Sequence, residues 1–529
     1  MQELSPPITI DGSTEANESV ASATVTAPNS LGSRFARGAV WSLIGTVASQ
    51  GLALAASVVT ARLLGKSGFG ELGMINSTVG VFGMLAGLGL GLTTTKYVAE
   101  FRSRDPERAG RIVGLTSLIA LSSGGLIAIA ILAFAPLLST RVLNAPHLAP
   151  ELRIGALLLL IYVLNGIQTG ALSGLEAFKE IAKAKFLRGT ASFPLIVAGV
   201  ILWRLPGAVW GLVITAALGW LFNSLFLRKE CRGAGIRLHF NGIWREGSIL
   251  WRFSLPAVLA DVAAGPAIWA ANAILANQTN GYSELGLFSA ADQWRNALMF
   301  LPNILLQVAL PILSSLDIES SDSDRSQFAR TFEITQTLTL GVVLPLGVLL
   351  ICFSDLVMSF YGAQFSRGVP SLIGVALTVM IMGVSAATGP AIQASGRMWI
   401  GFTVNLVWGI VMLGLVWSFA PRRGANALAY APAAAYVVLA ILTFLILRRE
   451  LGNGALLRAM AAIAWSVGTA ALGLMLPATV RHIVALPLLA ICIYATLFVF
   501  STRHTRQLLF SALGNLRALR QMRERITLP

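Results

Sequence analysis

The chain has 529 residues, of which 55% are hydrophobic and only 12% are charged, with a formal net charge of +15. A mean hydropathy of +0.74 excludes most water-soluble folds and indicates a membrane protein, in which a helix needs about 20 apolar residues to cross the bilayer. We therefore predict an all-α integral membrane protein with about fourteen transmembrane helices. In a soluble protein the positive charge would suggest nucleic acid, but here the partners expected are membrane lipids, and no nucleic acid is expected.

The basic residues are distributed unevenly between the two sides of the predicted spans. With the N-terminus inside, roughly three quarters of the 39 Lys and Arg residues fall on the cytoplasmic side, as the positive-inside rule describes. Both termini are therefore predicted to be cytoplasmic.

The chain begins with a polar stretch rich in Ser, Thr and Ala, which lacks the basic start and the apolar core of a signal peptide. We expect a disordered cytoplasmic tail there. The first span ends at Arg62 and Lys66, which could receive a substrate at the outer mouth or extend their charges to the membrane interface. The second span, residues 69–95, is rich in glycine and is expected to be bent or closely packed.

Basic stretches interrupt the apolar segments at three places. Residues 101–111 form a short cytoplasmic loop, and the amphipathic run 176–188 is expected to lie along the inner interface. The longest interruption divides the chain into two halves. The predicted parts are a tail (1–33), a first six-helix lobe (34–228), a cytoplasmic linker (229–252), a second six-helix lobe (253–447), an extra helix pair (448–500) and a basic tail helix (501–529).

An internal repeat relates the two halves. Residues 67–74 read SGFGELGM and residues 280–287 read NGYSELGL. Each segment follows one predicted span and opens the next. This pattern predicts a duplication of six spans, with a substrate site between the two lobes near the middle of the membrane.

Three ionisable residues, Asp261, Asp292 and Arg295, fall inside predicted spans of the second half. A charge at such depth costs roughly 2.5 to 3.5 kcal/mol, so these side chains are expected to face a bundle interior or a cavity. Arg295 either contacts an anionic substrate or forms an ion pair with Asp261 or Asp292. Asp261 is either this counter-ion or a site that couples transport to H⁺ or Na⁺.

Trp269 and Trp294 are expected to line the same cavity, while most other tryptophans anchor helices at the interface. The sequence shows no metal-ligand cluster, serine triad or pair of glycosidase carboxylates in a common frame. Neither an enzyme nor a bound cofactor is therefore expected.

The run TARLLGKSGFGELG at residues 60–73 and the segment 284–316, which ends in ALPILSSL, resemble the polysaccharide transporter family. This family contains the O-antigen and exopolysaccharide flippases of the multidrug/oligosaccharidyl-lipid/polysaccharide exporter superfamily. The resemblance implies two six-helix lobes that form a V around a central cavity and expose it alternately to each side. Arg62 matches the arginine that this family carries at the end of its first span.

The resemblance also implies a cargo, an oligosaccharide linked to undecaprenyl diphosphate, which crosses the bacterial inner membrane. A polysaccharide polymerase and glycosyltransferases are expected to work beside such a transporter. The alternative is a multidrug/cation antiporter of the same superfamily, which would use acidic sites for cationic drugs. The last two spans could form a lipid groove or lie at the periphery.

Overall fold

A computed structural model describes residues 28–237, 242–247, 264–314, 322–394, 397–451, 454–501 and 505–507, and all regular elements among them are helical. Asp261 and most of both predicted tails lie outside the described residues. The first half contains α2 (Pro28–Gly87), α3 (Leu90–Phe101), α4 (Pro106–Leu137), η1 (Leu138–Val142), η2 (Pro146–Leu148), α5 (Ala149–Gly174), α6 (Phe178–Gly233) and η3 (Ile243–Glu246).

The second half is helical in the same way. It contains α8 (Ala264–Ala276), α9 (Gly281–Leu298), α10 (Phe300–Ser314), α11 (Asp322–Cys352), α12 (Ser354–Ser359), η5 (Ala363–Gly368), α13 (Val369–Ala386), α14 (Thr388–Ala394), α15 (Met398–Arg423), α16 (Ala425–Ile446), α17 (Arg448–Leu451), α18 (Gly454–Met475), α19 (Ala478–Tyr494) and η6 (Ala495–Val499). Within the described residues, ten helices are long and apolar enough to cross a membrane, which confirms the predicted all-α membrane fold.

Two of these helices consist of two arms joined by a sharp break. In α2 the break is at Gly65, whose φ of 73° glycine adopts without steric cost. In α6 it is at Trp203 and Arg204, where the sequence separates two predicted spans. The glycine-rich second span is bent as expected, because Leu88 and Gly89 both have positive φ between α2 and α3.

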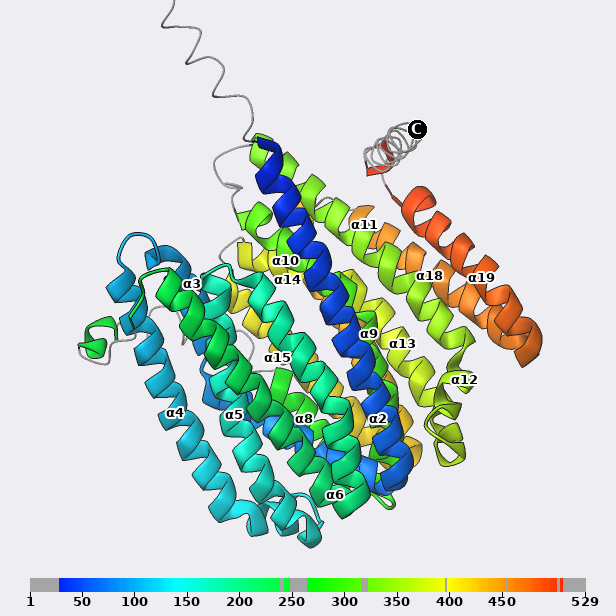
Figure 1. Cartoon of the computed structure of the whole chain (residues 1–529). Coiled ribbons are helices and arrows are strands. Elements are labelled where there is room, and N and C mark those ends of the chain that lie inside the picture. The colour runs from blue at the N-terminus through cyan, green and yellow to red at the C-terminus, as the bar shows by residue number, and fades with distance from the viewer. Residues whose placement is uncertain are drawn as a thin grey trace, which may run out of the picture.

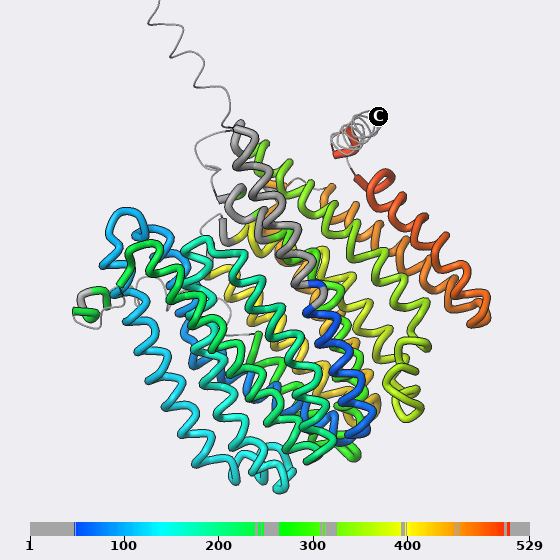
Figure 2. The backbone as a smooth tube through the Cα atoms, in the orientation of Figure 1, coloured from blue at the N-terminus to red at the C-terminus, as the bar shows by residue number. Residues whose placement is uncertain are grey.

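The helices form two groups on either side of the first arm of α2. In Figure 1, α4, α5 and α6 lie on one side, and α11, α13, α18 and α19 lie on the other. The tube in Figure 2 shows the α18–α19 hairpin, orange to red, at the outer edge of the second group. The start of α2 and the end of α19 lie at one end of the bundle, here called the near end, and the first arm of α2 ends at the opposite, far end.

The two repeated segments pack directly against each other near the far end. A Cβ atom on Gly70 of α2 would lie 1.9 Å from the carbonyl oxygen of Tyr282 in α9. A Cβ on Gly286 of α9 would lie 1.8 Å from the carbonyl oxygen of Lys66. Only glycine permits this approach of two backbones, so Gly70 and Gly286 set the distance between the two lobes.

A second feature supports the duplication. Arg204, at the break of α6, has φ 53° and ψ −128°, and Gly424, between α15 and α16, has φ 52° and ψ −130°. This conformation strains a residue with a side chain but not glycine. At this position the first lobe therefore has a strained arginine and the second lobe an unstrained glycine. The Arg204 side chain donates a hydrogen bond to the carbonyl oxygen of Leu63 at 3.1 Å.

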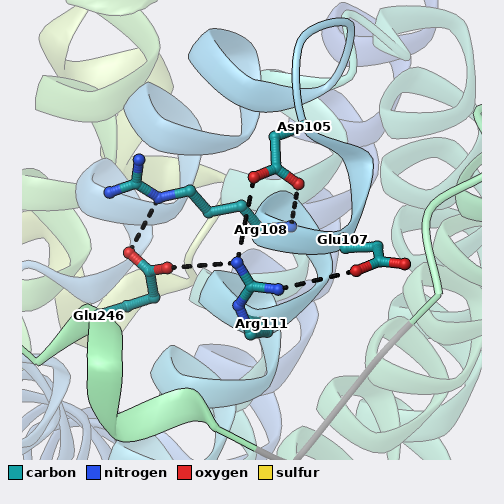
Figure 3. A network of polar contacts seen from close by, with 5 residues as sticks. All are labelled: Asp105, Glu107, Arg108, Arg111 and Glu246. Atoms are coloured by element: carbon teal, nitrogen blue, oxygen red, sulfur yellow. Dashed lines mark hydrogen bonds and ion pairs between the residues drawn. The ribbon is translucent and has the colours of Figure 1, made fainter.

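The described part of the linker between the lobes is fixed to the first lobe (Figure 3). The buried carboxylate of Glu246 in η3 lies 3.0 Å from Nε of Arg108 and 3.6 Å from a terminal nitrogen of Arg111, both in α4. Arg111 also lies 4.0 Å from Asp105 and from Glu107. Several charges share this network, which makes it stronger than a single exposed ion pair.

The hairpin of α18 and α19 is fixed to the second lobe by one ion pair from each helix. Arg458 of α18 pairs with Glu333 of α11 at 3.0 Å. Arg481, in the first turn of α19, pairs with Asp355 of α12 at 2.8 Å. These two ion pairs hold α18 against α11 and α19 against α12.

The contact between the repeated segments generates a prediction about stability. Gly70→Ala should destabilise the protein by about 1 to 3 kcal/mol, because the added Cβ meets backbone that no side-chain rotation can move. Gly80→Ala in the same helix is the control, since a Cβ there has nothing within 4 Å. The melting temperatures of the two purified variants in detergent give the comparison. Equal melting temperatures would contradict the proposed role of the close approach.

Candidate functional site

A cavity of about 1550 Å³, its open mouth included, lies between the two lobes and is called the central cavity below. The helices α2, α5 and α6 form most of its wall, and Ser289 and Gln293 of α9 complete it from the second lobe. Its polar lining consists of hydroxyl, amide and basic side chains: Ser49, Gln50, Ser57, Thr60, Asn76, Tyr162, Lys185, Arg188, Ser192, Thr215, Ser289 and Gln293. Within the described lining, no side chain carries a carboxylate.

Two cations, Lys185 and Arg188, supply the charge of this cavity. They stand three positions apart in the first arm of α6 and so lie on one face of that helix. Lys185 is exposed and Arg188 is half-buried, and neither has an ion-pair partner among the described residues. The predicted interfacial helix at 176–188 is wrong in this respect, because its residues from Phe178 onward are the first turns of α6 and its two last cations line the cavity.

Small residues hold these cations in place. The Ser49 hydroxyl donates a hydrogen bond to the carbonyl oxygen of Lys185 at 3.1 Å, and a Cβ on Gly189 would lie 2.2 Å from that hydroxyl. The alkyl stem of Arg188 runs over Gly219 in the second arm of α6, where an added Cβ would lie 2.8 Å from its Cδ. The two glycines let α2 and both arms of α6 approach closely enough to aim the cations at one space.

Buried amides fix the wall next to Gly219. Asn165 of α5 donates to the carbonyl oxygen of Ala216 in α6 at 3.0 Å, and Asn223 donates to the side-chain oxygen of Asn165 at 3.0 Å. These bonds link α5 to the second arm of α6. They therefore stabilise the part of α6 around Gly219, against which the Arg188 side chain packs.

Three hydroxyl groups in the lining, those of Ser57, Thr60 and Thr215, are buried and have no hydrogen-bond partner among the described residues. Thr60 is 2% exposed and Thr215 is 8% exposed. A buried hydroxyl without a partner costs about 1 to 3 kcal/mol. The three oxygen atoms are enclosed by protein in this state, so a polar ligand in the cavity reaches them only when these side chains or the helices around them move.

The predicted pair Asp292 and Arg295 lies in a second cavity, of about 640 Å³, inside the second lobe. Nε and a terminal nitrogen of Arg295 donate to the two carboxylate oxygens of Asp292 at 2.7 and 2.9 Å. This forked pair neutralises both charges on one helix. Since Ser289 and Gln293 line the central cavity, α9 separates the two cavities and presents a different face to each.

Arg62 and Lys66 lie at the far end of the bundle, on either side of the break at Gly65. Nε of Arg62 donates to the carbonyl oxygen of Phe360, which belongs to the second lobe. Neither basic residue is among those lining the central cavity. Arg62 thus connects the two lobes in the state that the structure shows.

The two predicted tryptophans line neither cavity. Trp269 of α8 donates from Nε1 to the hydroxyl of Thr78 in α2 at 3.1 Å, and its ring stands edge-on to Phe82. Trp294 is partly buried against the hydrophobic core. Of the predicted site residues that the structure describes, only Asp292 and Arg295 are brought together.

Lys185 and Arg188 were not among the predicted site residues. One signal in the sequence could have indicated them. No turn separates the basic run from the apolar residues after Arg188, so both belong to one helix, α6. The hydroxyls of Ser57, Thr60 and Thr215 have no such signal. They converge only when α2 packs against the second arm of α6.

The forked pair generates a prediction about the second lobe. Arg295→Gln should lower stability because Asp292 loses its counter-ion. The loss should be smaller than the roughly 3 to 5 kcal/mol of a fully buried pair, because the side chains of Arg295 and Asp292 are 33% and 27% exposed. Asp292→Asn/Arg295→Gln should recover the melting temperature. A double variant as unstable as the single one would show that the pair is not what holds Arg295.

The bond from Arg62 generates a prediction about access. Arg62→Gln should open the far end, so that a cysteine introduced by Ser57→Cys is labelled faster by a membrane-impermeant maleimide added to intact cells. Arg204→Gln is the matched control, because Arg204 also donates to a carbonyl but within its own lobe. The three native cysteines are buried, which keeps the background low. Equal labelling rates in both backgrounds would contradict the role given to Arg62.

Comparison with known proteins gives a family and several relatives. Residues 35–317 match the family described as "Polysaccharide biosynthesis protein". The EPS I polysaccharide export inner membrane protein EpsE of Ralstonia solanacearum is 24% identical over 443 residues, which cover 81% of this chain and 97% of that protein. The Lipid III flippase of Escherichia coli K12 is 27% identical over 291 residues, which cover 53% of this chain and 68% of that protein.

Solved structures share the fold. The lipid II flippase MurJ in an inward closed conformation aligns with a TM-score of 0.65 at 14% identity, covering 86% of this chain and 98% of that one. A multidrug resistance MATE family transporter in an inward-facing conformation aligns with a TM-score of 0.62 at 15% identity, covering 76% and 94%. Since the family match extends over more than half of the sequence, the chain belongs to the polysaccharide biosynthesis protein family.

Proposed function

We propose that this protein is a flippase, which carries oligosaccharide units linked to undecaprenyl diphosphate from the cytoplasmic to the outer leaflet of the bacterial inner membrane. The observation that carries the proposal is the pair of cations, Lys185 and Arg188, in a cavity between the lobes whose described lining holds no carboxylate. Such a site attracts anions. It also remains accessible to a ligand, because neither cation is committed to a described partner.

The two side chains suit a diphosphate in different ways. Arginine presents a planar fork that binds two phosphate oxygens together, whereas lysine supplies a compact charge on a flexible stem. A diphosphate that links a lipid to a sugar carries two negative charges, which two cations would neutralise. Lys185 and Arg188 also lie roughly 10 and 15 Å along α6 from its start, at about 1.5 Å per residue, closer to the near end than to the break at Arg204.

The named relatives agree with this cargo. EpsE is described as a polysaccharide export protein and the E. coli relative as a lipid III flippase. For this chain we propose a surface polysaccharide, O-antigen or exopolysaccharide, as the product to which the cargo contributes. Glycosyltransferases would build the unit at the cytoplasmic face and a polymerase would use it at the outer face.

The alternative, a multidrug/cation antiporter, shares the fold but differs in the charge it requires. A cationic drug needs an acidic group at its site, and the described lining of the central cavity contains none. The acid of the second cavity, Asp292, is already paired with Arg295. The charge of the central cavity therefore favours the flippase over the antiporter. We further propose that transport is coupled to H⁺ or Na⁺, with Asp261 and Asp292 as the candidate acids.

Transport by such a fold requires the lobes to separate at one end while they close at the other. In this structure they meet at the far end, through Arg62 and Phe360 and through the close approach of Gly70 and Gly286. The positive-inside distribution assigns the far end to the outer side of the membrane. We infer that this state receives cargo from the cytoplasmic leaflet and that these contacts break before release.

The proposal predicts that Lys185→Gln/Arg188→Gln loses transport. A charge-assisted hydrogen bond to phosphate contributes about 1.5 to 3 kcal/mol, so each single substitution should lower cargo affinity by roughly 10- to 100-fold. The measurement is the flipping of undecaprenyl-diphosphate-linked oligosaccharide in proteoliposomes, with protein amount held equal.

Lys183→Gln is the matched control. It removes the same charge from the same helix, but Lys183 pairs with Glu180 at 3.1 Å and does not line the cavity. It should flip cargo at the wild-type rate. Wild-type flipping by the well-folded double variant at Lys185 and Arg188 would overturn the proposed site.

A further inference from the structure

The polar groups of the central cavity differ in charge between its far half and its near half. Arg204 bonds to the carbonyl oxygen of Leu63, so the breaks in α2 and α6 lie at one level at the far end. Counted from the breaks at Gly65 and Arg204 at about 1.5 Å per residue, Thr60, Ser57 and Thr215 lie at roughly 8, 12 and 16 Å. The three hydroxyls without partners therefore occupy the half of the cavity toward the far end.

The cations occupy the other half. By the same count, Arg188 and Lys185 lie roughly 24 and 28 Å from the level of the breaks. They are the only charged side chains in the described lining. Arg62 stands at the far mouth but bonds to the carbonyl of Phe360 and is not part of this lining.

This arrangement limits the charge that the far half can hold. The two cations balance the two negative charges of a diphosphate, and the described lining holds no third cation for a second anion. A carboxylate placed among uncharged hydroxyls and amides at membrane depth would remain unneutralised, which is costly. Sugar hydroxyl and acetamido groups, by contrast, add no charge, and they can accept hydrogen bonds from Thr60 and Thr215 once these enclosed hydroxyls rotate toward the cavity.

We propose that the central cavity takes its cargo with the glycan leading toward the far end, and that the sugars next to the diphosphate are uncharged. This inference rests on the proposed function and adds an orientation and a substrate class to it. Lys185 and Arg188 hold the diphosphate, whereas Ser57, Thr60 and Thr215 act as specificity-determining residues that meet the sugars. The hydroxyls that lack protein partners acquire them when the glycan enters.

The test uses three defined lipids and the full-length protein in detergent. The probes are undecaprenyl diphosphate without sugar, the same lipid with a neutral trisaccharide, and the same lipid with a trisaccharide that contains one hexuronic acid. The wild type should bind the neutral form at least tenfold more tightly than either of the other two. Dissociation constants from titration against a fluorescently labelled cargo give the comparison.

Variants separate this inference from the proposed function. Thr60→Val/Thr215→Val removes both hydroxyls with little change in shape, and it should weaken binding of the neutral form at least tenfold while leaving the sugar-free lipid unaffected. Thr190→Val is the control, because Thr190 is exposed on the same helix as Thr215 and bonds to the carbonyl oxygen of Phe186. Lys185→Gln/Arg188→Gln should weaken binding of all three lipids.

Two results would overturn the inference while leaving the flippase standing. One is unchanged affinity of the threonine double variant for the neutral form, and the other is binding of the hexuronate form as tight as that of the neutral form. A wild-type protein that binds none of the three lipids would overturn the proposed function itself, and this inference with it.

Discussion

A charge inside the hydrocarbon region must find a counter-charge, water or a ligand, because the lipid offers none of them. The two lobes meet this constraint in opposite ways. In the second lobe, Asp292 and Arg295 stand three positions apart on α9 and neutralise each other. In the first lobe, Lys185 and Arg188 face a large polar cavity without a described acid. The second lobe therefore contains a neutralised ion pair, and the first lobe presents two positive charges that no described acid balances. Two such charges suit a diphosphate cargo.

The large features of the fold follow from sequence because the bilayer dictates them. A span must be long and apolar, so hydropathy locates it, and the break in α6 coincides with the interruption of an apolar run by Arg204, Leu205 and Pro206. Gly70 of the first repeated segment and Gly286 of the second lie where the backbones of the two lobes touch. The all-helical membrane fold and the bend in the second span could be predicted, since each depends on local composition.

The site could be predicted only in part, because it depends on how faces meet. Arg295 is conspicuous in the sequence since it interrupts an apolar run, yet it is paired within its own helix. Lys185 and Arg188 belong to a basic run, which hydropathy assigns to the interface. Only the packing of α2 and α6 around Gly189 and Gly219 turns them into the cavity. Sequence thus indicates where charge is unusual, and tertiary packing decides where charge is exposed.

The position of α9 between two cavities has a consequence for how this helix can vary. Each residue of an α-helix turns the next by about 100°, and here the neighbours Asp292 and Gln293 face different compartments. Inserting a single residue before Asp292 would move its carboxylate to the position of Gln293, in the space where an anion is expected to bind. Substitutions along α9 can be absorbed one side chain at a time, but a shift in its register cannot. The length of this helix up to Asp292 is therefore constrained more tightly than its composition.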